Sequence, residues 1–299
     1  MARLLDGKAC SKAIEEELKA EVATLSVVPK LVLLLVGSNP DSKTYVKLKK
    51  NACTRVGIEA EIREIDEADL HAQICALNED PSVHGILLQL PLPASLAPAE
   101  QRLLHTVRPE RDVDGLHPHH FYELPRLTAH PASHRHLHLP PCTPAGCLEL
   151  LTRNGIEVAD KDVVIIGRGQ LVGLPLSLMM LQRNATVTTC HTHTKDLAEK
   201  VKRADIVVVA TGKPELVRGD WVKDGAVVID VGINYVDDAT SKKGYKILGD
   251  VTFDEVSAKA SAITPVPGGI GPMTIAMLLK NVVASAKFAA AAPAPSAKV

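Results

Sequence analysis

The stretch Val163-Val-Ile-Ile-Gly167-Arg168-Gly169-Gln-Leu-Val-Gly173 decides the fold. Its four apolar residues predict a strand buried on both faces, and the glycines that follow predict a tight turn into a helix. Glycines in such a turn let the backbone approach a pyrophosphate, and the helix start offers free N–H groups to it. The stretch therefore predicts a dinucleotide site, although a tight turn without any ligand has the same pattern.

The rest of the chain alternates strand-like and helix-like segments. Strand-like runs lie at 31–36, 58–65, 83–90, 163–166, 185–189, 205–210 and 226–231. Helical segments are predicted at 12–23, at 40–56 between a cap at Asn39 and a stop at Gly57, and at 274–288. This alternation predicts an α/β fold with a mainly parallel sheet and helices on both faces. A length of 299 residues suits two domains.

Composition narrows the class of protein. Hydrophobic residues make up 46% of the chain and aromatic residues only 3%, so the core must be aliphatic. The formal net charge of -1 gives no general attraction to nucleic acid or to an acidic membrane, and no apolar run of 18 residues is found. The six cysteines form no Cys-x-x-Cys pair and are interpreted as buried or free thiols. With no recognisable targeting segment, the sequence predicts a cytoplasmic enzyme.

The segment after the next strand bears on the choice of cofactor. A site for NAD usually places Asp or Glu there to hold the ribose hydroxyls. This chain instead has Thr189-Cys-His191-Thr192-His193-Thr194, which contains no acid. Arg168 in the glycine turn can reach a 2′-phosphate, so the pattern favours NADP over NAD. The alternative is that Arg168 is only a solvated turn residue.

The first half carries a second group of polar residues. Tyr45 and Lys49 are four residues apart on a predicted helix and so share a face, where a tyrosine can stack and a lysine can move protons. The neighbouring lysines allow the simpler interpretation of a solvated basic face. Gln89 ends an apolar strand, and Asp112-Val-Asp114-Gly115 puts two carboxylates in a turn.

Taken together, the motifs resemble the bifunctional methylenetetrahydrofolate dehydrogenase/cyclohydrolase family. They occur in family order across nearly the whole chain, at 45–49, 85–93, 112–115, 141–146, 211–214, 229–234, 249–251 and 264–274. The resemblance implies oxidation of 5,10-methylenetetrahydrofolate with NADP and hydrolysis of the methenyl product to 10-formyltetrahydrofolate, in one cleft between two lobes. It also implies a folate-binding catalytic domain at 1–141 plus 272–299, a Rossmann-like dinucleotide-binding domain at 142–271, and a last helix that returns to the first lobe.

The resemblance assigns roles by motif position. Lys49 becomes the general acid/base, Gln89 orients its amine, Tyr45 stacks on the folate, and Asp114 pairs with the pterin, while Asp112 is a turn cap. The remaining substrate-binding positions are Leu88, Leu90, Pro267, Gly268, Gly269, Ile270 and Gly271. The cofactor-binding positions are Gly167, Arg168, Gly169, Gly173, Thr192, His193, Thr194 and Ile233.

The sequence departs from the family pattern at Gly169 and Thr192, where relatives often have Ser, so the NADP prediction rests more on Arg168 and Thr192. No G-x-x-x-x-G-K-[ST] loop is present, and no formate–tetrahydrofolate ligase activity is predicted. By analogy we expect a homodimer. Two alternatives stay open: a dehydrogenase alone that prefers NAD, and a folate- or dinucleotide-binding protein without catalysis.

One segment has no counterpart in these motifs. Residues 118–144 are rich in His and Pro without a clean period and are interpreted as a long connecting loop, and the tail from Ala289 to Val299 as frayed. The histidines that crowd the connector are His117, His119, His120, His130, His134, His136 and His138. Their spacing matches no tetrahedral metal pattern, so no metal is predicted and a solvated, pH-responsive loop is preferred.

Overall fold

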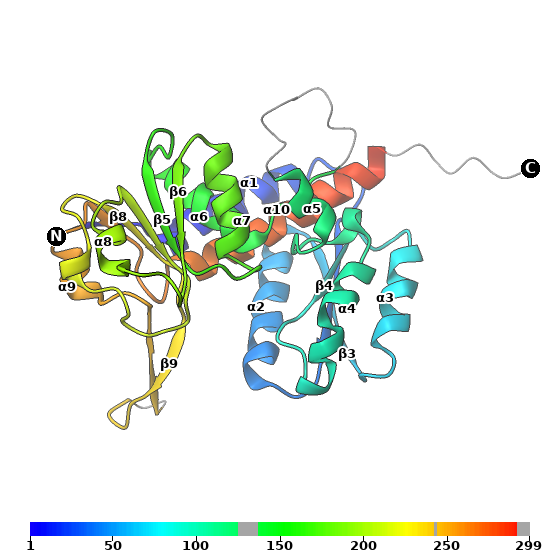
Figure 1. Ribbon diagram of the computed structural model, residues 1–299. Coiled ribbons are helices and arrows are strands. Elements are labelled where there is room, and N and C mark those ends of the chain that lie inside the picture. The colour runs from blue at the N-terminus through cyan, green and yellow to red at the C-terminus, as the bar shows by residue number, and fades with distance from the viewer. Residues whose placement is uncertain (125–136, 242–243, 292–299) are drawn as a thin grey trace, which may run out of the picture. The chain divides into compact units, whose positions relative to one another are not determined.

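The computed structural model describes residues 1–124, 137–241 and 244–291 (Figure 1). Within these ranges the chain forms two compact units, each with its own parallel sheet. The large-sheet unit comprises Met1–Lys12 and Thr143–Thr274, and the small-sheet unit comprises Ala13–Glu123, 137–142 and the residues from Ile275 onward. The two-domain α/β prediction is confirmed.

The large-sheet unit contains six strands, and every neighbouring pair is parallel. In spatial order they are β1 (Arg3–Leu4), β11 (Ala262–Ile263), β8 (Val227–Asp230), β7 (Ile206–Val209), β5 (Asp162–Ile166) and β6 (Thr186–Cys190). The four longer strands match the apolar runs of the second half of the sequence. β1 and β11 are two residues each, too short to give a period in the sequence. Pairing of β1 with β11 places the first twelve residues in this unit rather than with the expected first domain.

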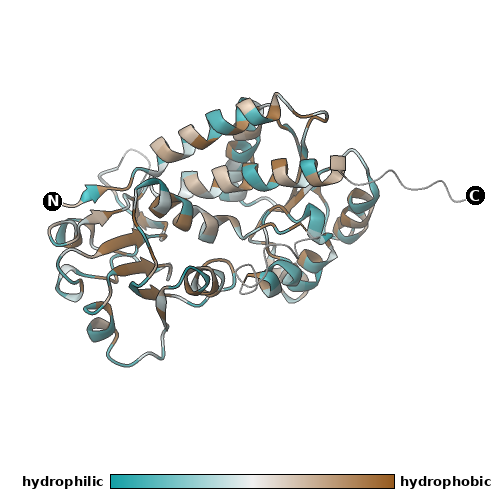
Figure 2. Cartoon of the chain, turned by 90° about the horizontal axis from the view of Figure 1, so that it is seen from above, coloured by the Kyte–Doolittle hydropathy of each residue, from teal (hydrophilic) through white to brown (hydrophobic). Residues whose placement is uncertain are grey.

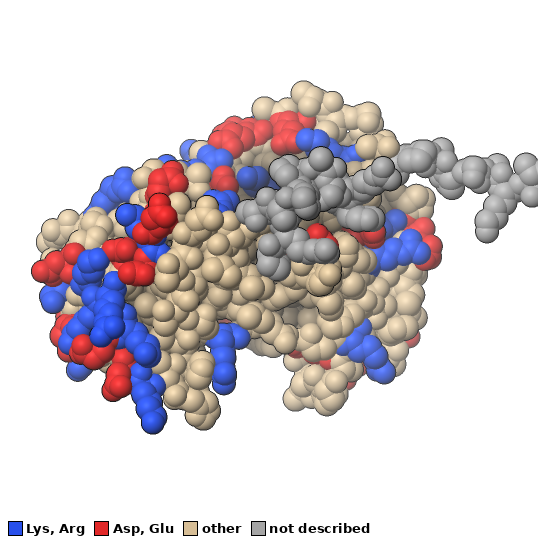
Figure 3. Space-filling model, turned by 45° about the horizontal axis from the view of Figure 1, so that its top comes forward, with Lys and Arg blue, Asp and Glu red and all other residues tan. Residues whose placement is uncertain are grey.

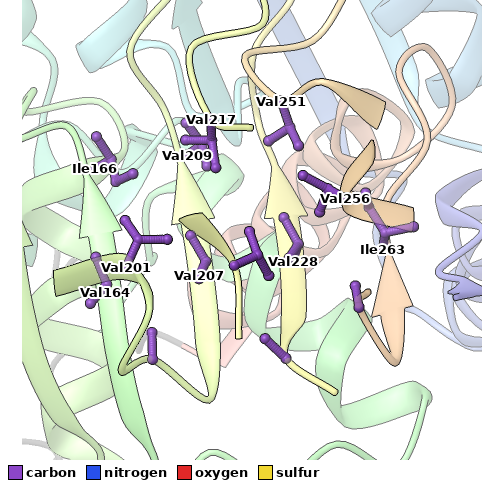
Figure 4. Packing of buried hydrophobic residues seen from close by; sticks show 14 of the residues in the cluster. Val164, Ile166, Val201, Val207, Val209, Val217, Val228, Val251, Val256 and Ile263 are labelled. Atoms are coloured by element: carbon purple, nitrogen blue, oxygen red, sulfur yellow. The ribbon is translucent and has the colours of Figure 1, made fainter. Parts of the chain in front are cut away.

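Aliphatic side chains hold one face of this sheet against the surrounding helices and loops. Val164, Val207 and Val228 come from three neighbouring strands and pack with Val201 and Val256 from α8 (Leu197–Val201) and α9 (Phe253–Ser257) (Figure 4). In Figure 2 several strands of this sheet are brown, as expected for β5, β7 and β8, whose residues are mostly buried, whereas β1 and β6 are largely exposed. The unit also contains α6 (Cys142–Arg153), α7 (Gly173–Gln182), η4 (Gly219–Trp221) and an antiparallel hairpin of β9 (Asn234–Asp237) and β10 (Tyr245–Leu248).

The small-sheet unit is built on three parallel strands in the order β3 (Glu59–Ile65), β2 (Lys30–Val36) and β4 (Gly85–Leu88). After β2, Asn39 caps helix α2 (Pro40–Val56) by accepting hydrogen bonds from the amides of Asp41 and Ser42, and Gly57 ends it with a φ of 86°. Both ends are as predicted. The other short helices are η1 (Ala94–Ala99), α3 (Leu70–Glu79), α4 (Glu100–Thr106), η2 (Pro109–Arg111) and α5 (Pro118–Glu123).

The bounds predicted for three segments were wrong. The expected loop at 118–144 contains α5 at its start and the first residues of α6 at its end, while residues 125–136, including His130, His134 and His136, lie outside the described residues. The expected N-terminal helix begins earlier, as α1 (Gly7–Val22). The last helix, α10 (Ile270–Ala291), extends beyond the predicted 274–288, and residues 292–299 are not described.

Helix α10 is the one described helix that is long and apolar enough to cross a membrane. Of the most apolar 18-residue stretch of α10, 56% is buried inside the structure. Buried core helices of soluble proteins are equally apolar. On the face shown in Figure 3, positive and negative side chains occur close together. Neither feature indicates a membrane partner.

A buried carboxyl group and a buried histidine lie side by side where the small-sheet unit turns after η2. The Oδ2 atom of Asp112 accepts a hydrogen bond from the His117 amide at 2.6 Å, so Asp112 caps the turn as predicted. The Nε2 atom of His120 lies 2.9 Å from the Pro109 carbonyl, and its Nδ1 atom accepts from the Leu139 amide at 3.3 Å. Only a neutral imidazole can make both bonds.

Burial shifts the pKa values of Asp112 and His120 in opposite directions. Desolvation raises the pKa of Asp112 from 3.8 to about 7 and lowers the pKa of His120 from 6.5 to about 3. The stabilising contribution of Asp112 is therefore complete below pH 3.8 and is lost as the pH rises to about 7. The contribution of His120 is complete above pH 6.5 and is lost as the pH falls toward 3.

We predict that Asp112→Asn and His120→Gln change the pH dependence of stability with opposite signs. Between about pH 4 and 7, the free energy of unfolding of Asp112→Asn should rise relative to wild type as the pH rises, and that of His120→Gln as the pH falls. The slope for one group cannot exceed about 1.4 kcal/mol per pH unit. Urea unfolding across this range measures both. Parallel changes in the two variants would contradict the burial argument.

Candidate functional site

The predicted proton-transfer pair is formed in the small-sheet unit. The Nζ atom of Lys49 on α2 donates a hydrogen bond to Oε1 of Gln89 at 3.0 Å. Gln89 directly follows β4, is 8% exposed, and donates from Nε2 to the Leu90 carbonyl at 2.6 Å. A protonated lysine can only donate, and the Leu90 carbonyl can only accept, so the two bonds fix which end of the Gln89 amide faces Lys49.

Tyr45 lies one turn before Lys49 on the same face of α2, and both side chains are partly exposed. Lys47, which lies between Tyr45 and Lys49, and Lys50, which follows Lys49, are both exposed. The interpretation as a solvated basic face therefore holds for Lys47 and Lys50 but not for Lys49. The backbone amide of Gln89 bonds to the Leu34 carbonyl, which continues the sheet past the end of β4. Leu88 is buried in the same strand and Leu90 is partly exposed.

Asp114 lies in a turn that is held from several sides. Asp112 forms a parallel bridge with Ile86 of β4. The side-chain amide of Asn281 on α10 donates to the carbonyls of Val113 and Pro140, both at 2.9 Å. These contacts fix the backbone just before Asp114, whose own side chain is partly exposed.

Cys142 connects this turn with the lysine. Its thiol donates to the Val113 carbonyl at 3.3 Å and is completely buried. Burial, and next the negative charge of Asp114, raise the pKa of Cys142 well above its ordinary value, while Lys49 acts in the opposite direction. Lys49 and Asp114 are thus both close enough to influence one thiol, which places them in the same neighbourhood of the small-sheet unit.

The glycine turn of the large-sheet unit has the predicted strand–turn–helix form. Gly167 has a φ of 122°, and an added Cβ atom there would lie 2.2 Å from the Ala210 carbonyl oxygen. A Cβ atom at Gly173 would lie 2.0 Å from the Gly167 carbonyl oxygen, so both positions require glycine. Gly169 differs, because no atom lies within 4 Å of its Cβ position. Helix α7 begins at Gly173 without a side-chain cap; the Leu174 amide donates to the Gly169 carbonyl at 3.0 Å and Pro175 has no N–H, so the Gly173 amide is the first-turn donor that remains for an anion.

Basic side chains gather beside this turn. Arg168 and His193 both act on His191, and partial desolvation, followed by their positive charges, lowers the pKa of His191. A lowered pKa makes His191 a weaker source of positive charge near neutral pH. Thr194 accepts a hydrogen bond from the His191 amide at 2.8 Å and so shapes the loop, whereas Thr192 is exposed.

The remaining predicted positions form two loops of the large-sheet unit. Ile233 follows β8 and is 43% exposed, and its Cδ1 atom lies 3.9 Å from the Cβ position of Gly271. Gly268 has a φ of 112°, and its carbonyl accepts a hydrogen bond from the Lys8 amide at 3.1 Å. Pro267 is exposed, while Gly269 and Ile270 are buried.

Sequence reasoning missed the buried polar groups behind these loops. Asn281 and Cys142 hold the Asp114 turn, and Asp230 and Asp250 lie behind Ile233. Burial, together with the neighbouring charge of Asp250, raises the pKa of Asp230 to about 7. Both aspartates lie in motifs noted above, at 229–234 and 249–251, but no sequence pattern indicates a hydrogen-bond partner for either.

Comparison with known proteins identifies the two halves. A family model for the catalytic domain of tetrahydrofolate dehydrogenase/cyclohydrolase matches residues 5–114, and one for the NAD(P)-binding domain of the same family matches 141–290. The bifunctional protein FolD 2 of Arabidopsis thaliana is 47% identical over 294 residues, which cover 96% of each chain. The bifunctional protein FolD of Geotalea uraniireducens is also 47% identical, over 96% of this chain and 99% of the relative.

Solved structures agree with this assignment. The bifunctional enzyme FolD of Campylobacter jejuni superposes with a TM-score of 0.88 at 45% identity, covering 96% of this chain and 99% of the other. The Trypanosoma brucei enzyme, solved with NADP cofactor and inhibitor, has a TM-score of 0.90 at 40% identity and covers 97% and 99%. The chain belongs to the tetrahydrofolate dehydrogenase/cyclohydrolase family.

Proposed function

We propose that the chain oxidises 5,10-methylenetetrahydrofolate to the methenyl compound with NADP and hydrolyses that product to 10-formyltetrahydrofolate. The observation that carries the hydrolytic half is the direct hydrogen bond between Lys49 and Gln89. A dehydrogenase alone has no need for an oriented amine at this position. The two matched family domains cover 5–114 and 141–290, and neither is a formate–tetrahydrofolate ligase domain.

The folate-binding roles follow from the chemistry of the side chains. Tyr45 offers a flat, partly exposed ring on which the folate can stack. The pterin presents a donor edge resembling guanidinium, and the carboxylate of Asp114 accepts two parallel hydrogen bonds from such an edge. Since its turn is fixed by Asp112 and Asn281, Asp114 can bind this edge with little loss of conformational freedom. The backbone at 267–271 and the side chains of Leu88 and Leu90 complete the proposed folate contacts.

Hydrolysis requires two proton transfers, which we assign to Lys49. As the oxygen of water bonds to the cationic methenyl carbon, the neutral amine of Lys49 accepts a proton from that water. When the bond from this carbon to N5 then breaks, the ammonium group returns a proton to N5, the remaining hydroxyl proton leaves to solvent as the oxygen becomes a carbonyl, and the formyl group stays on N10. Gln89 keeps the amine oriented throughout, because its carbonyl oxygen accepts from either form of the lysine.

The large-sheet unit supplies the proposed cofactor contacts. The backbone of the glycine turn and the Gly173 amide at the start of α7 suit a pyrophosphate group. Arg168, with Thr192 and His193 beside it, offers a positive site for a 2′-phosphate, and the absence of an acid at 189–194 supports NADP rather than NAD. Bound NADP supplies the hydride acceptor, Ile233 contacts its nicotinamide, and Thr194 helps to shape its site.

We also infer that the chain works in a reducing compartment such as the cytoplasm. All six cysteines are free. Burial raises the pKa values of Cys53 and Cys147 to about 12, so neither thiol forms a thiolate readily. Buried unreactive thiols without disulfides are typical of intracellular proteins.

Lys49→Ala should abolish hydrolysis of methenyltetrahydrofolate. Loss of a general acid/base lowers such a rate by roughly a hundredfold or more. The decrease in methenyl absorbance measures it. Lys47→Ala is the matched control, because Lys47 lies on the same helix with an exposed side chain and should leave the rate unchanged. Hydrolysis by Lys49→Ala near the wild-type rate would show that the assignment of Lys49 is wrong.

Gly169→Ser should improve the use of NADP. The position has room for a side chain, and a serine hydroxyl there adds one hydrogen bond to the 2′-phosphate. A hydrogen bond to a charged group is worth about 1.5–3 kcal/mol, so kcat/KM for NADP should rise roughly tenfold to a hundredfold. Assays with NAD provide the control, since NAD has no 2′-phosphate. Equal changes with both cofactors, or a wild-type enzyme that prefers NAD, would overturn the proposed 2′-phosphate site.

We further propose a homodimer that forms through the large-sheet unit. β6 is an edge strand of the described sheet, and the neighbouring helix α7 exposes Leu174 and Leu181. An open strand edge beside exposed leucines suits pairing with a second copy. Thr188→Pro with Leu181→Asp should therefore produce monomers in light scattering, whereas Val28→Asp, at an exposed site of the small-sheet unit, should not. A monomeric wild-type protein would refute the dimer.

A further inference from the structure

Two buried carboxyl groups of the large-sheet unit have no role in the chemistry described so far. Asp230 ends strand β8 and is 4% exposed, and Asp250 follows β10 and is 0% exposed. A buried charge is costly unless hydrogen-bond donors surround it. The donors around these two groups come from the loops that follow β7, β8 and β10.

Asp250 joins two of these loops. Its Oδ2 atom accepts hydrogen bonds from the Thr211 amide at 2.6 Å, the Thr211 hydroxyl at 2.9 Å and the Gly212 amide at 2.9 Å. Its Oδ1 atom accepts from Nδ2 of Asn234 at 2.8 Å. Thr211 and Gly212 follow β7, and Asn234 begins the hairpin after β8, so one side chain connects both.

Asp230 binds the third loop. Its Oδ1 atom accepts from the amides of Gly232 at 2.9 Å and Asp250 at 3.0 Å, and its Oδ2 atom accepts from the amide of Val251 at 3.0 Å. The fit is tight. A Cβ atom at Gly232 would lie 2.2 Å from Oδ1 of Asp250, and one at Gly249 would lie 1.9 Å from Oδ2 of Asp230.

Ile233 lies between the residues that these carboxylates hold. The residue before it, Gly232, is bound through its amide to Asp230, and the residue after it, Asn234, is bound through its side chain to Asp250. The side chain of Ile233 itself is exposed. An exposed apolar side chain has little packing of its own, so its position depends on the backbone that carries it.

We propose that Asp250, supported by Asp230, is a positioning residue for hydride transfer, which holds Ile233 and the Thr211–Gly212 turn against the nicotinamide of the cofactor. This inference rests on the proposed function, in which Ile233 contacts the nicotinamide. Hydride transfer depends on positioning, and a misplacement of about 1 Å costs on the order of a hundredfold in rate. The hydrolytic step uses Lys49 and Gln89 and needs no nicotinamide, so Asp250 affects only the oxidation.

Asp250→Asn tests the proposal with a small change in shape. The remaining carbonyl oxygen can still accept from Thr211 and Gly212, but the new NH2 group then faces Nδ2 of Asn234, and two donors cannot bond. If Asn234 turns its carbonyl oxygen toward the new group instead, it loses the hydrogen bond from its Nδ2 to the Leu248 carbonyl. Either way the attachment of Asn234 is weakened while the bonds to Thr211 and Gly212 remain. Asp237→Asn, on the same hairpin with an exposed side chain, is the matched control and should retain both activities.

The measurements separate the two activities. We expect kcat for NADPH formation from methylenetetrahydrofolate to fall about tenfold to a hundredfold in Asp250→Asn. Hydrolysis of methenyltetrahydrofolate should stay within about twofold of wild type. Substrate deuterated at the one-carbon bridge should show a larger isotope effect on kcat than it does with wild type, because hydride transfer becomes slower than other steps. A purely structural role would not change that effect.

Asn234→Ala removes the hydrogen bond between Asn234 and Asp250 by deleting its donor. This variant tests the proposal if Asp250→Asn does not fold. If Asp250 acts through Asn234, the double variant should be no slower than the slower single variant. Equal loss of both activities, or an unchanged isotope effect, would overturn the proposal. A wild-type enzyme without NADP-dependent oxidation would instead refute the proposed function, because that result does not depend on Asp250.

Discussion

Backbone amides in the loops that follow buried parallel strands must find hydrogen-bond acceptors away from water, and both candidate sites of this chain depend on how they do so. The backbone N–H and C=O groups of the strands bond to neighbouring strands, but those of the loops have no such partners. In the large-sheet unit, Asp230 and Asp250 accept the amides of Thr211, Gly212 and Gly232. In the small-sheet unit, Asp112 performs the same task for His117. Carboxylates suit this position because one group can accept several bonds at once.

The strands, the glycine turn and the limits of α2 could be predicted, because each depends on residues that are neighbours in the sequence. Asn39 and Gly57 act within four residues of themselves. The glycine turn follows directly from an apolar strand, and the structure gives the reason why Gly167 and Gly173 cannot carry a side chain. The pair of Lys49 and Gln89 was predicted through the family resemblance, since the two residues are 40 positions apart.

The contacts that could not be predicted join residues far apart in the chain. Asn281 reaches Val113 across 168 positions, and Asp250 reaches Thr211 across 39. The residue type does not reveal the hydrogen-bond partner in either case. An asparagine or an aspartate in a loop looks the same in the sequence whether its side chain binds water or a buried backbone group. β1 was missed for a related reason: two residues give no period, and the pairing with β11 depends on where residue 262 lies.

The two reactions depend on different properties of the protein, which are access to water for proton transfer and a rigid geometry for hydride transfer. The residues proposed for the two reactions differ accordingly in how deeply they are buried. A group that exchanges protons with water must reach it, and Lys49 is accordingly only partly buried and held by a single bond to Gln89. A group that only fixes geometry works best where water cannot compete for its bonds, and Asp250 is completely buried with four donors around it. Hydride transfer relies on geometry and hydrolysis on proton movement. In the proposed roles, the partly exposed Lys49 and the buried Asp250 belong to different steps, which is why a change at one should leave the other step largely intact.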